Sequence, residues 1–179
     1  MHYPSILARK SKLLKNKNPP YRREPQEYRL ILSKAKAHLN SPLNNMVYSI
    51  LLFAFRRPGT TPAEFKAHHE GSHVPLVKPI AGPLFLISHT RYYLQRSSDA
   101  SGEYPATVLV GAQANFQYDA FAELKFKDEA AFGAFFAHVS SDENAAKIAA
   151  DEEKFLDRAK ITVVVISDCT TTSSDIAQA

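Results

Sequence analysis

The sequence predicts an α+β fold in which one four-stranded sheet is covered by helices on one side. Four short runs are rich in β-branched and aromatic residues, as is typical of buried strands. Segments between these runs repeat apolar residues at helical spacing. The order strand, helix, strand, strand, helix (in two pieces), strand interleaves two strand–helix–strand units, so a split βαβ sandwich is expected.

The first strand and the first helix are expected within residues 47–73. The run VYSILLFAFRR at 47–57 reads as a buried strand that a Pro-Gly pair ends. Thr61 and Glu64 have the spacing of a capping box, with proline at the first helical position. We therefore expect a helix over residues 62–73. It should stop near Val74, because Pro75 disfavours helical geometry in the residue before it.

The remaining elements follow in the second half of the chain. Strands are expected at 84–95, 118–126 and 160–169, a loop at 97–105, and a short strand or a pocket flap at 106–111. Asp128 begins a helix with phenylalanines on one face. A second capping box from Ser140 to Glu143 leads to a further helix through about Asp157, with Ile148, Phe155 and Leu156 directed inward.

These elements form a ferredoxin-like sandwich whose second sheet face also needs a cover. The last strand is almost continuously apolar, as expected for a strand buried on both faces. Its apolar residues are Ile161, Val163, Val164, Val165 and Ile166. The identical face of a second chain would cover the sheet, so we expect a homodimer in which two chains close a shared α/β barrel.

The charge distribution separates a basic arm from a mildly acidic body. Residues 1–45 hold ten Lys or Arg and two Glu, although the net charge of the whole chain is only +4. We expect a disordered extension over 1–45, which includes the case of a start placed upstream of Met46 as the natural initiator. A folded domain over 46–169 and a polar disordered tail over 170–179 are expected to follow. A targeting or nucleic-acid-binding arm is the alternative, but few aromatic residues interleave with the basic ones, so no nucleic acid partner is predicted.

Composition places the chain among soluble proteins. A single cysteine, Cys169, excludes an intrachain disulfide and a C-x-x-C metal site. No apolar run is long enough to span a bilayer, and the first residues lack a secretory segment. We therefore expect a cytoplasmic protein with no membrane partner.

Residues 69–73 read H-E-x-x-H, the pattern that places two zinc ligands and a general base on one helix. Gly71 lies inside the motif, Pro75 follows it closely, and the sequence offers no third ligand at a familiar spacing. We therefore predict no metal. Phe65, His69 and His73 share one helix face, which favours a packing role for His69 and either a helix-capping or a catalytic role for His73.

Three motifs, AEFKAHHEGSHVPLV, YDAFAELKF and DEEKFLD, resemble the EthD domain of the dimeric α/β-barrel superfamily in the same order. The resemblance covers roughly residues 46–169. It implies that His73 corresponds to the family histidine, that the Pro-Leu pair after it is shared, and that Asp119 and Glu123 lie on an acidic strand. His69 occupies a place where many members have Trp or Tyr, which supports an aromatic packing role for it.

The segments FxxFFAxVS and IAADEEKFLDRAK are similar to small fungal proteins of aromatic polyketide clusters. That resemblance implies a cofactor-free decarboxylase or dehydratase acting on a polyketide carboxylic acid in secondary metabolism. Both reactions need proton transfer and little else, and a histidine serves as either acid or base near neutral pH. No nucleotide-binding or covalent-nucleophile motif competes with this reading.

We predict His73 as the general acid/base, with His89 or Asp119 as its partner. Alternation along the strand places Asp119, Phe121 and Glu123 on the face opposite the small residues that suit helix packing. His89, Arg91 and Tyr93 share one face of their strand, but the sequence does not decide whether that face lines the cavity. An aromatic pocket would hold a flat substrate, with Arg91 as a carboxylate anchor. The predicted substrate-binding residues are His69, Arg91, Tyr93, Phe53, Phe121 and Glu123.

Three other functions fit the same fold. A cofactor-free monooxygenase would consume oxygen and form a carbonyl. A haem-binding barrel would use a histidine as axial ligand. A non-catalytic dimeric binder would hold aromatic ligands without turnover.

Overall fold

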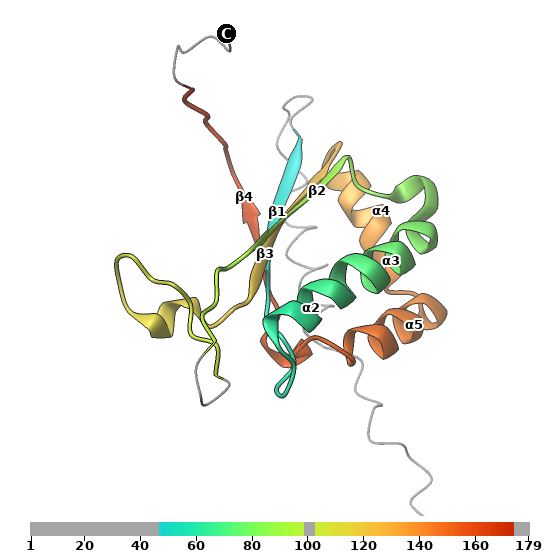
Figure 1. The fold of residues 1–179 in the computed structure, drawn as a ribbon. Helices are drawn as coiled ribbons and strands as arrows, with labels where there is room; N and C mark the ends of the chain where they lie inside the picture. The colour runs from blue at the N-terminus through green and yellow to red at the C-terminus, as the bar shows by residue number, and fades with distance from the viewer. Residues whose placement is uncertain (1–46, 99–102, 174–179) are drawn as a thin grey trace, which may run out of the picture. The chain divides into compact units, whose positions relative to one another are not determined.

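The computed structural model describes residues 47–98 and 103–173, which form one antiparallel four-stranded sheet with helices on one face (Figure 1). The strands are β1 Tyr48–Ala54, β2 Ser88–Tyr93, β3 Ala120–Phe126 and β4 Thr162–Ile166, in the order β2-β3-β1-β4. This order confirms the predicted α+β, ferredoxin-like fold. The expected arm over 1–45 and the end of the expected tail, 174–179, lie outside the described residues.

The connections make two interleaved units. β3 lies between β1 and β2, and β1 lies between β3 and β4, with every neighbouring pair antiparallel. The register of β1 with β3 joins Ile50 to Leu124 and Leu52 to Ala122. Because directly opposite residues project to the same side of a sheet, the small and apolar face of β3 expected to pack on helices does so.

The helical elements all cover the same side of the sheet. They are α2 Pro62–His68, the π-helical turn η1 His69–His73, α3 Val74–Ala81, α4 Glu129–Val139 and α5 Asp142–Glu152. Short 3₁₀ turns lie at η2 Gly82–Leu84, η3 Gln113–Phe116 and η4 Arg158–Lys160. α3 ends where Gly82 has φ 54°, a backbone conformation that favours glycine.

The first helical segment begins as predicted but does not end as predicted. The Thr61 hydroxyl accepts a hydrogen bond from the Glu64 N–H, and the Glu64 carboxylate accepts from the Thr61 N–H, so the capping box is confirmed. The expected stop near Val74 is wrong, because the helix passes through η1 into α3. The Val74 N–H donates to the His69 carbonyl five residues back, and this wider turn relieves the clash that Pro75 would make in an α-helix.

Two further boundaries differ from the sequence prediction. α5 has Ser141 as its N-cap, without a side-chain cap bond, so the capping box expected at Ser140 is wrong. The helix ends at Glu152 rather than near Asp157, yet Phe155 and Leu156 are buried as predicted. Residues 106–111 contribute only an isolated bridge at Ala106, so of the two alternatives, a short strand or a pocket flap, the strand does not form.

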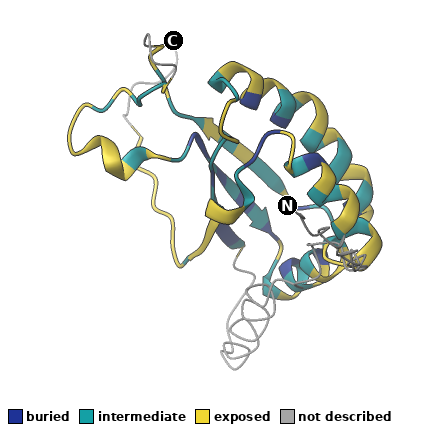
Figure 2. Cartoon of the chain, turned by 90° about the horizontal axis from the view of Figure 1, so that it is seen from below, coloured by how far each residue is buried: buried dark blue, intermediate teal, exposed yellow. Residues whose placement is uncertain are grey.

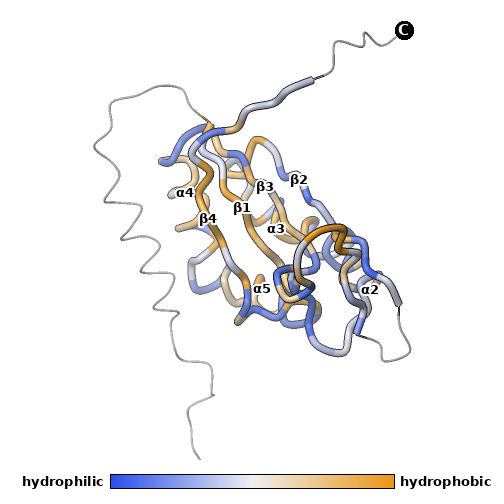
Figure 3. The backbone as a smooth tube through the Cα atoms, turned by 90° about the vertical axis from the view of Figure 1, so that its left-hand side faces the viewer, coloured by the Kyte–Doolittle hydropathy of each residue, from blue (hydrophilic) through white to orange (hydrophobic). Residues whose placement is uncertain are grey.

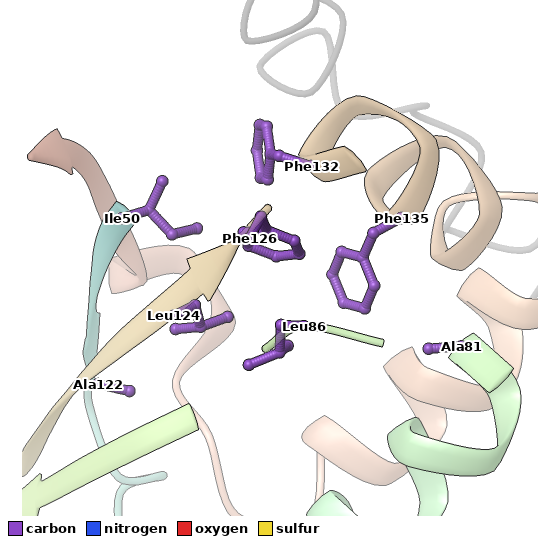
Figure 4. Packing of buried hydrophobic residues seen from close by; sticks show 8 residues of the cluster. All are labelled: Ile50, Ala81, Leu86, Ala122, Leu124, Phe126, Phe132 and Phe135. Carbon is purple, nitrogen blue, oxygen red and sulfur yellow. The ribbon is translucent and has the colours of Figure 1, made fainter. Parts of the chain in front are cut away.

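Two apolar clusters join the sheet to the helices. The larger one packs the helix-facing side of β1 and β3 against α3 and α4 (Figure 4). Its buried residues are Ile50, Ala81, Leu86, Ala122, Leu124, Phe126, Phe132 and Phe135. The smaller cluster, Ala54, Phe65, Ala120, Phe155 and Leu156, lies where α2 meets the segment after α5. It holds the start of α2 and the π-helical turn close to β2 and β3.

The opposite face of the sheet has no covering layer within the described chain (Figure 3). In β4, Val163, Val164 and Val165 are 42–55% exposed, so the expected burial of this strand on both faces does not occur in a single chain. β1 and β3 are buried or half-buried along their length, whereas the helices carry many exposed residues (Figure 2). The apolar strand β4 is therefore an edge that only β1 pairs within the described residues.

The two helix caps of the second crossover give a stability test. The Asp128 carboxylate accepts a hydrogen bond from the Ala131 N–H at the start of α4, whereas Ser141 makes no such bond at the start of α5. We expect Asp128→Ala to lower the free energy of unfolding by about 1 kcal/mol, and Ser141→Ala to change it by less than about 0.5 kcal/mol. Urea unfolding measures both, and equal losses would contradict the assigned caps.

Candidate active site

Polar side chains from η1 and β2 meet between the helix layer and the sheet. His69, Glu70 and His73 come from η1. In β2, His89 and Arg91 pair with Leu124 and Ala122 of β3, and Tyr93 pairs with Ala120, so all three face the helices. The structure therefore settles the orientation of β2 that the sequence left open. It brings together four predicted site residues, His69, His89, Arg91 and Tyr93, with the predicted acid/base His73.

His73 is held by a carboxylate from α5. Its Nδ1 lies 3.0 Å from Oδ2 of Asp151, and Nε2 of His68 lies 2.8 Å from Oδ1 of the same carboxylate. The His73 side chain is 14% exposed and that of Asp151 7%. Because the carboxylate only accepts, each imidazole donates to it. This leaves Nε2 of His73 without a hydrogen-bond partner among the described residues.

Asp151 stays ionised despite its burial. Desolvation by itself would raise the pKa of this carboxyl, but the hydrogen bonds from His68 and His73 outweigh it, and the pKa is lowered. The arrangement is that of an aspartate–histidine pair, in which the carboxylate orients the ring and stabilises the imidazolium that forms when the other nitrogen takes a proton.

A second network joins η1 to β2 through Glu70. Arg91 donates from Nε and Nη2 to the two carboxylate oxygens of Glu70, at 2.7 and 2.9 Å, and Tyr93 donates its hydroxyl to Glu70 at 2.6 Å. Hydrogen bonding from Arg91 is the main reason that the pKa of Glu70 falls to about 2. The third donor group of Arg91, Nη1, bonds the His89 carbonyl. Arg91 is thus engaged by the protein itself.

His69 lies between the two networks and packs against aromatic rings. It is 6% exposed, and its ring lies 5.6 to 5.9 Å from those of Phe65, Phe155 and Tyr93. Phe155 also lies under His68 and His73, at 4.7 and 5.2 Å. The contacts fit the aromatic packing role expected of His69, and its Nδ1 additionally lies 3.1 Å from the Tyr93 hydroxyl oxygen.

Burial keeps two of the histidines neutral. Desolvation, followed by the charges of His73 and His89, lowers the pKa of His69 to about 3. Desolvation, followed by the charge of Arg91, lowers the pKa of His89 to about 4. Both rings are therefore unprotonated bases at neutral pH, and neither serves as a proton donor in its cationic form.

Asp119 lies outside this cluster. It precedes β3, is 6% exposed, and accepts hydrogen bonds from the Arg56 N–H and Nε, while the guanidinium of Arg96 lies 3.3 Å away. Arg96 also donates to the carbonyls of Tyr104, Phe116 and Tyr118. The carboxylate thus anchors the two arginines that hold the long β2–β3 connection, and no described contact joins it to His73.

Three predicted binding residues face the other side of the sheet. Phe53 and Phe121 pair across β1 and β3, and Phe121 stacks on Tyr92 with centroids 4.7 Å apart. Glu123 lies on the same face, 3.2 Å from Lys125. The sheet therefore separates Phe53, Phe121 and Glu123 from the histidine cluster, and one pocket cannot be lined by both groups.

The sequence pattern of the EthD domain matches residues 57–159, which is more than half of the chain. The chain belongs to the EthD domain family. The matched segment contains α2, η1, β2, β3 and both helices of the second crossover, and so includes every residue of the histidine cluster.

Among solved structures, the chain is similar to an EthD family protein from Bacillus halodurans, with 18% identity and a TM-score of 0.43, over 69% of this chain and all of that one. It is also similar to an EthD-like protein from Ralstonia eutropha, with 19% identity and a TM-score of 0.44, over 74% and 99%. A protein from Arabidopsis thaliana gives 16% identity and a TM-score of 0.41, over 70% and 99%. No curated protein matches.

Sequence reasoning about this EthD domain missed Asp151, Glu70 and His68 as site residues. Asp151 carried a signal, because Ile148, Asp151 and Phe155 recur at i, i+3 and i+7, which places a carboxylate on an otherwise apolar stripe. No sequence pattern indicated Glu70, because its contact with Arg91 depends on the π-helical turn.

Residues 47–98 and 103–173 contain no group of three or more His, Cys, Asp or Glu placed to hold a metal ion. The helices of the same ranges include none long and apolar enough to cross a membrane. A hollow of about 270 Å³ lies between the end of β2 and residues 106–116, and it shares no residue with the histidine cluster.

The low pKa of His69 predicts how stability changes with pH. The unfolded histidine takes a proton near pH 6.5, whereas the folded one resists until about pH 3, so stability is lost as pH falls through this window. We expect His69→Phe, which keeps the aromatic packing, to flatten the slope of unfolding free energy between pH 6 and 4 by up to about 1.4 kcal/mol per pH unit. Urea unfolding at several pH values measures it. Tyr92→Phe is the control, and equal slopes in all three proteins would contradict the assignment.

Proposed function

We propose that this EthD domain is a cofactor-independent lyase, a decarboxylase or dehydratase, that acts on an aromatic polyketide carboxylic acid of fungal secondary metabolism. The His73–Asp151 pair is the observation that carries the proposal. It presents an imidazole whose Nδ1 is held by a buried carboxylate and whose Nε2 has no partner in the described chain. Such a group performs general acid–base catalysis without a metal or organic cofactor.

In the decarboxylation, the bond between the carboxylate carbon and its neighbour breaks, CO₂ leaves, and the electron pair enters the conjugated carbonyl system as an enolate. His73, protonated at Nε2, then delivers its proton to the carbon that lost the carboxylate. Asp151 stabilises the imidazolium before this transfer, and a proton from water restores it.

In the dehydration, neutral His73 removes the proton next to a carbonyl at Nε2. The electron pair forms the carbon–carbon double bond, the β-hydroxyl leaves, and the same imidazolium supplies the proton that makes it water. One histidine thus serves as base and then as acid, which requires a group that changes protonation state readily near neutral pH.

The roles proposed for the other predicted residues follow from their contacts. His89 faces the cluster and is neutral, so we propose that it contacts the substrate rather than protonates it. Three N–H groups of Arg91 are engaged by Glu70 and the His89 carbonyl, which argues against its use as a carboxylate anchor. Asp119 is held by Arg56 and Arg96, and Asp151 takes its place as the proposed partner of His73.

We also propose that two chains pack through the open face of the sheet to form a homodimer, in the cytoplasm. The aromatic set on this face supports the packing, since Tyr92 is 47% exposed while stacked on Phe121. Val164, 49% exposed, extends the apolar surface over β4. Exposed apolar surface of this kind is typical of interfaces between subunits.

Turnover measured without oxygen or metal tests the reaction. Metal-stripped protein is incubated anaerobically with a polycyclic polyketide carboxylic acid, and products are weighed by mass spectrometry. We expect loss of CO₂ or of water, with kcat reduced on the order of 10²–10⁴-fold in His73→Ala. Asp151→Asn should also lower kcat, because an amide cannot stabilise the imidazolium. Asp119→Asn is the matched control and should retain far more activity, provided that circular dichroism shows folded protein.

The outcomes separate the candidate functions. Turnover that appears only in air, with oxygen added to the product, would establish the monooxygenase instead. No mass change under either atmosphere across a panel of such acids would leave a ligand binder. Loss of activity in Asp119→Asn but not in Asp151→Asn would reverse the assigned partner of His73.

The homodimer has a separate test. Tyr92→Arg and Phe121→Arg place charges on the open face, and we expect each to convert a dimer into a monomer in size-exclusion chromatography with light scattering. Ala146→Arg, on the exposed side of α5, is the control and should leave the dimer intact. A wild-type chain that is monomeric at micromolar concentration would contradict the proposal.

A further inference from the structure

The hydrogen bonds around His69 determine which tautomer its ring adopts. Tyr93 has one hydroxyl proton and donates it in a 2.6 Å hydrogen bond to Glu70, which Arg91 keeps in the carboxylate form. The Tyr93 oxygen therefore acts as the acceptor toward Nδ1 of His69, 3.1 Å away. It follows that the proton of neutral His69 lies on Nδ1 and that Nε2 carries a lone pair.

That lone pair has no hydrogen-bond partner among residues 47–98 and 103–173, although the side chain is only 6% exposed. Nε2 keeps some contact with solvent, because among the described residues only Arg96 Nε is a side-chain polar atom that is both fully buried and without a hydrogen-bond partner. The rings around His69 include those of His73 and His89, with centroids 5.7 and 6.3 Å away. The ring that carries this acceptor thus lies near the proposed acid/base, and the acceptor is not fully enclosed.

We propose that His69 is a specificity-determining residue, whose Nε2 accepts a hydrogen bond from a hydroxyl group of the bound substrate. The substrate class is thereby narrowed to aromatic acids that carry a phenolic or enolic hydroxyl near the reacting carbon. A carboxylate oxygen or a carbonyl offers no proton to this nitrogen and would be repelled by its lone pair. The inference deepens the proposed function, because it assumes that substrate binds against the cluster of His69, His73 and His89.

Two physical effects make this acceptor selective. Burial lowers the pKa of His69 to about 3, so the ring is neutral and its Nε2 is an acceptor at neutral pH. A buried acceptor that a ligand covers but does not satisfy loses its interaction with water without replacement, which penalises ligands that lack the donor. The Tyr93–Glu70–Arg91 network acts through His69 by fixing the tautomer, so Tyr93 is a positioning residue.

The first test reads the tautomer directly. Protein labelled with ¹⁵N-histidine is examined at pH 7 by a long-range ¹H–¹⁵N spectrum, which distinguishes a protonated ring nitrogen from one with a lone pair. We expect His69 to be protonated at Nδ1 and bare at Nε2, and Tyr93→Phe to release this preference. The opposite tautomer in wild type, or an unchanged tautomer in Tyr93→Phe, would overturn the assignment.

The second test measures binding, independently of turnover, with 2-naphthol and 2-methoxynaphthalene, which differ by the hydroxyl proton. We expect wild type to prefer 2-naphthol roughly 5- to 100-fold, with the ¹⁵N signal of His69 Nε2 shifted on addition. In His69→Phe the preference should vanish or reverse, whereas Tyr92→Phe, on the other sheet face, should retain it. A preference that survives in His69→Phe overturns the inference, as does its absence from wild type or a failure of both probes to shift Nε2.

These outcomes are distinguishable from those of the turnover experiment. A phenol preference that depends on His69, in a protein that converts no polyketide acid, would refute the lyase and leave the recognition site standing. Turnover that is equal for a hydroxylated acid and its methyl ether would retain the lyase and refute the role of His69.

Discussion

The widened helical turn at His69–His73 is the constraint on which the arrangement of the site depends. In a regular α-helix, adjacent side chains would be separated by a larger angle about the helix axis than in this turn. Pro75 would also end a regular α-helix at this point. In the π-helical turn, His69 and Glu70 both reach β2, while His73 reaches Asp151 on α5. The same turn lets the helix continue into α3, whose Ala81 packs in the larger core cluster. One local departure therefore supports both the chemistry and the packing of the helix layer.

Two carboxylates, Asp151 and Glu70, divide the site into regions with different proton behaviour. Asp151 holds His73 by a hydrogen bond to Nδ1 and so fixes the orientation of its ring. The charge of the Glu70 carboxylate is balanced by Arg91, and Glu70 orients the Tyr93 hydroxyl that contacts His69. Burial keeps the His69 ring neutral. In the proposed function, these two neighbouring histidines perform separate tasks, His73 as acid/base and His69 as a fixed acceptor.

The sheet separates catalysis from assembly in the proposed function. The helix-facing side of β2 carries His89, Arg91 and Tyr93, while the other side of the same strands carries Tyr92 and Phe121. This division follows from the alternation along each strand, since successive residues project to opposite faces of the sheet. A substitution on either face is thus expected to affect one property while leaving the other in place, unless it disrupts the strand.

The sequence by itself determined the fold class, the capping box at Thr61, the helix start at Asp128 and the inward burial of Phe155, because these follow from local periodicity and capping chemistry. It also indicated His69, His73, His89, Arg91 and Tyr93. Only the tertiary structure decided which face of β2 joins the helices, that the helix passes Pro75, and that Asp151 rather than Asp119 contacts His73. These depend on contacts between residues as many as 78 positions apart, and no local pattern reports which buried carboxylate such a packing brings to a given histidine.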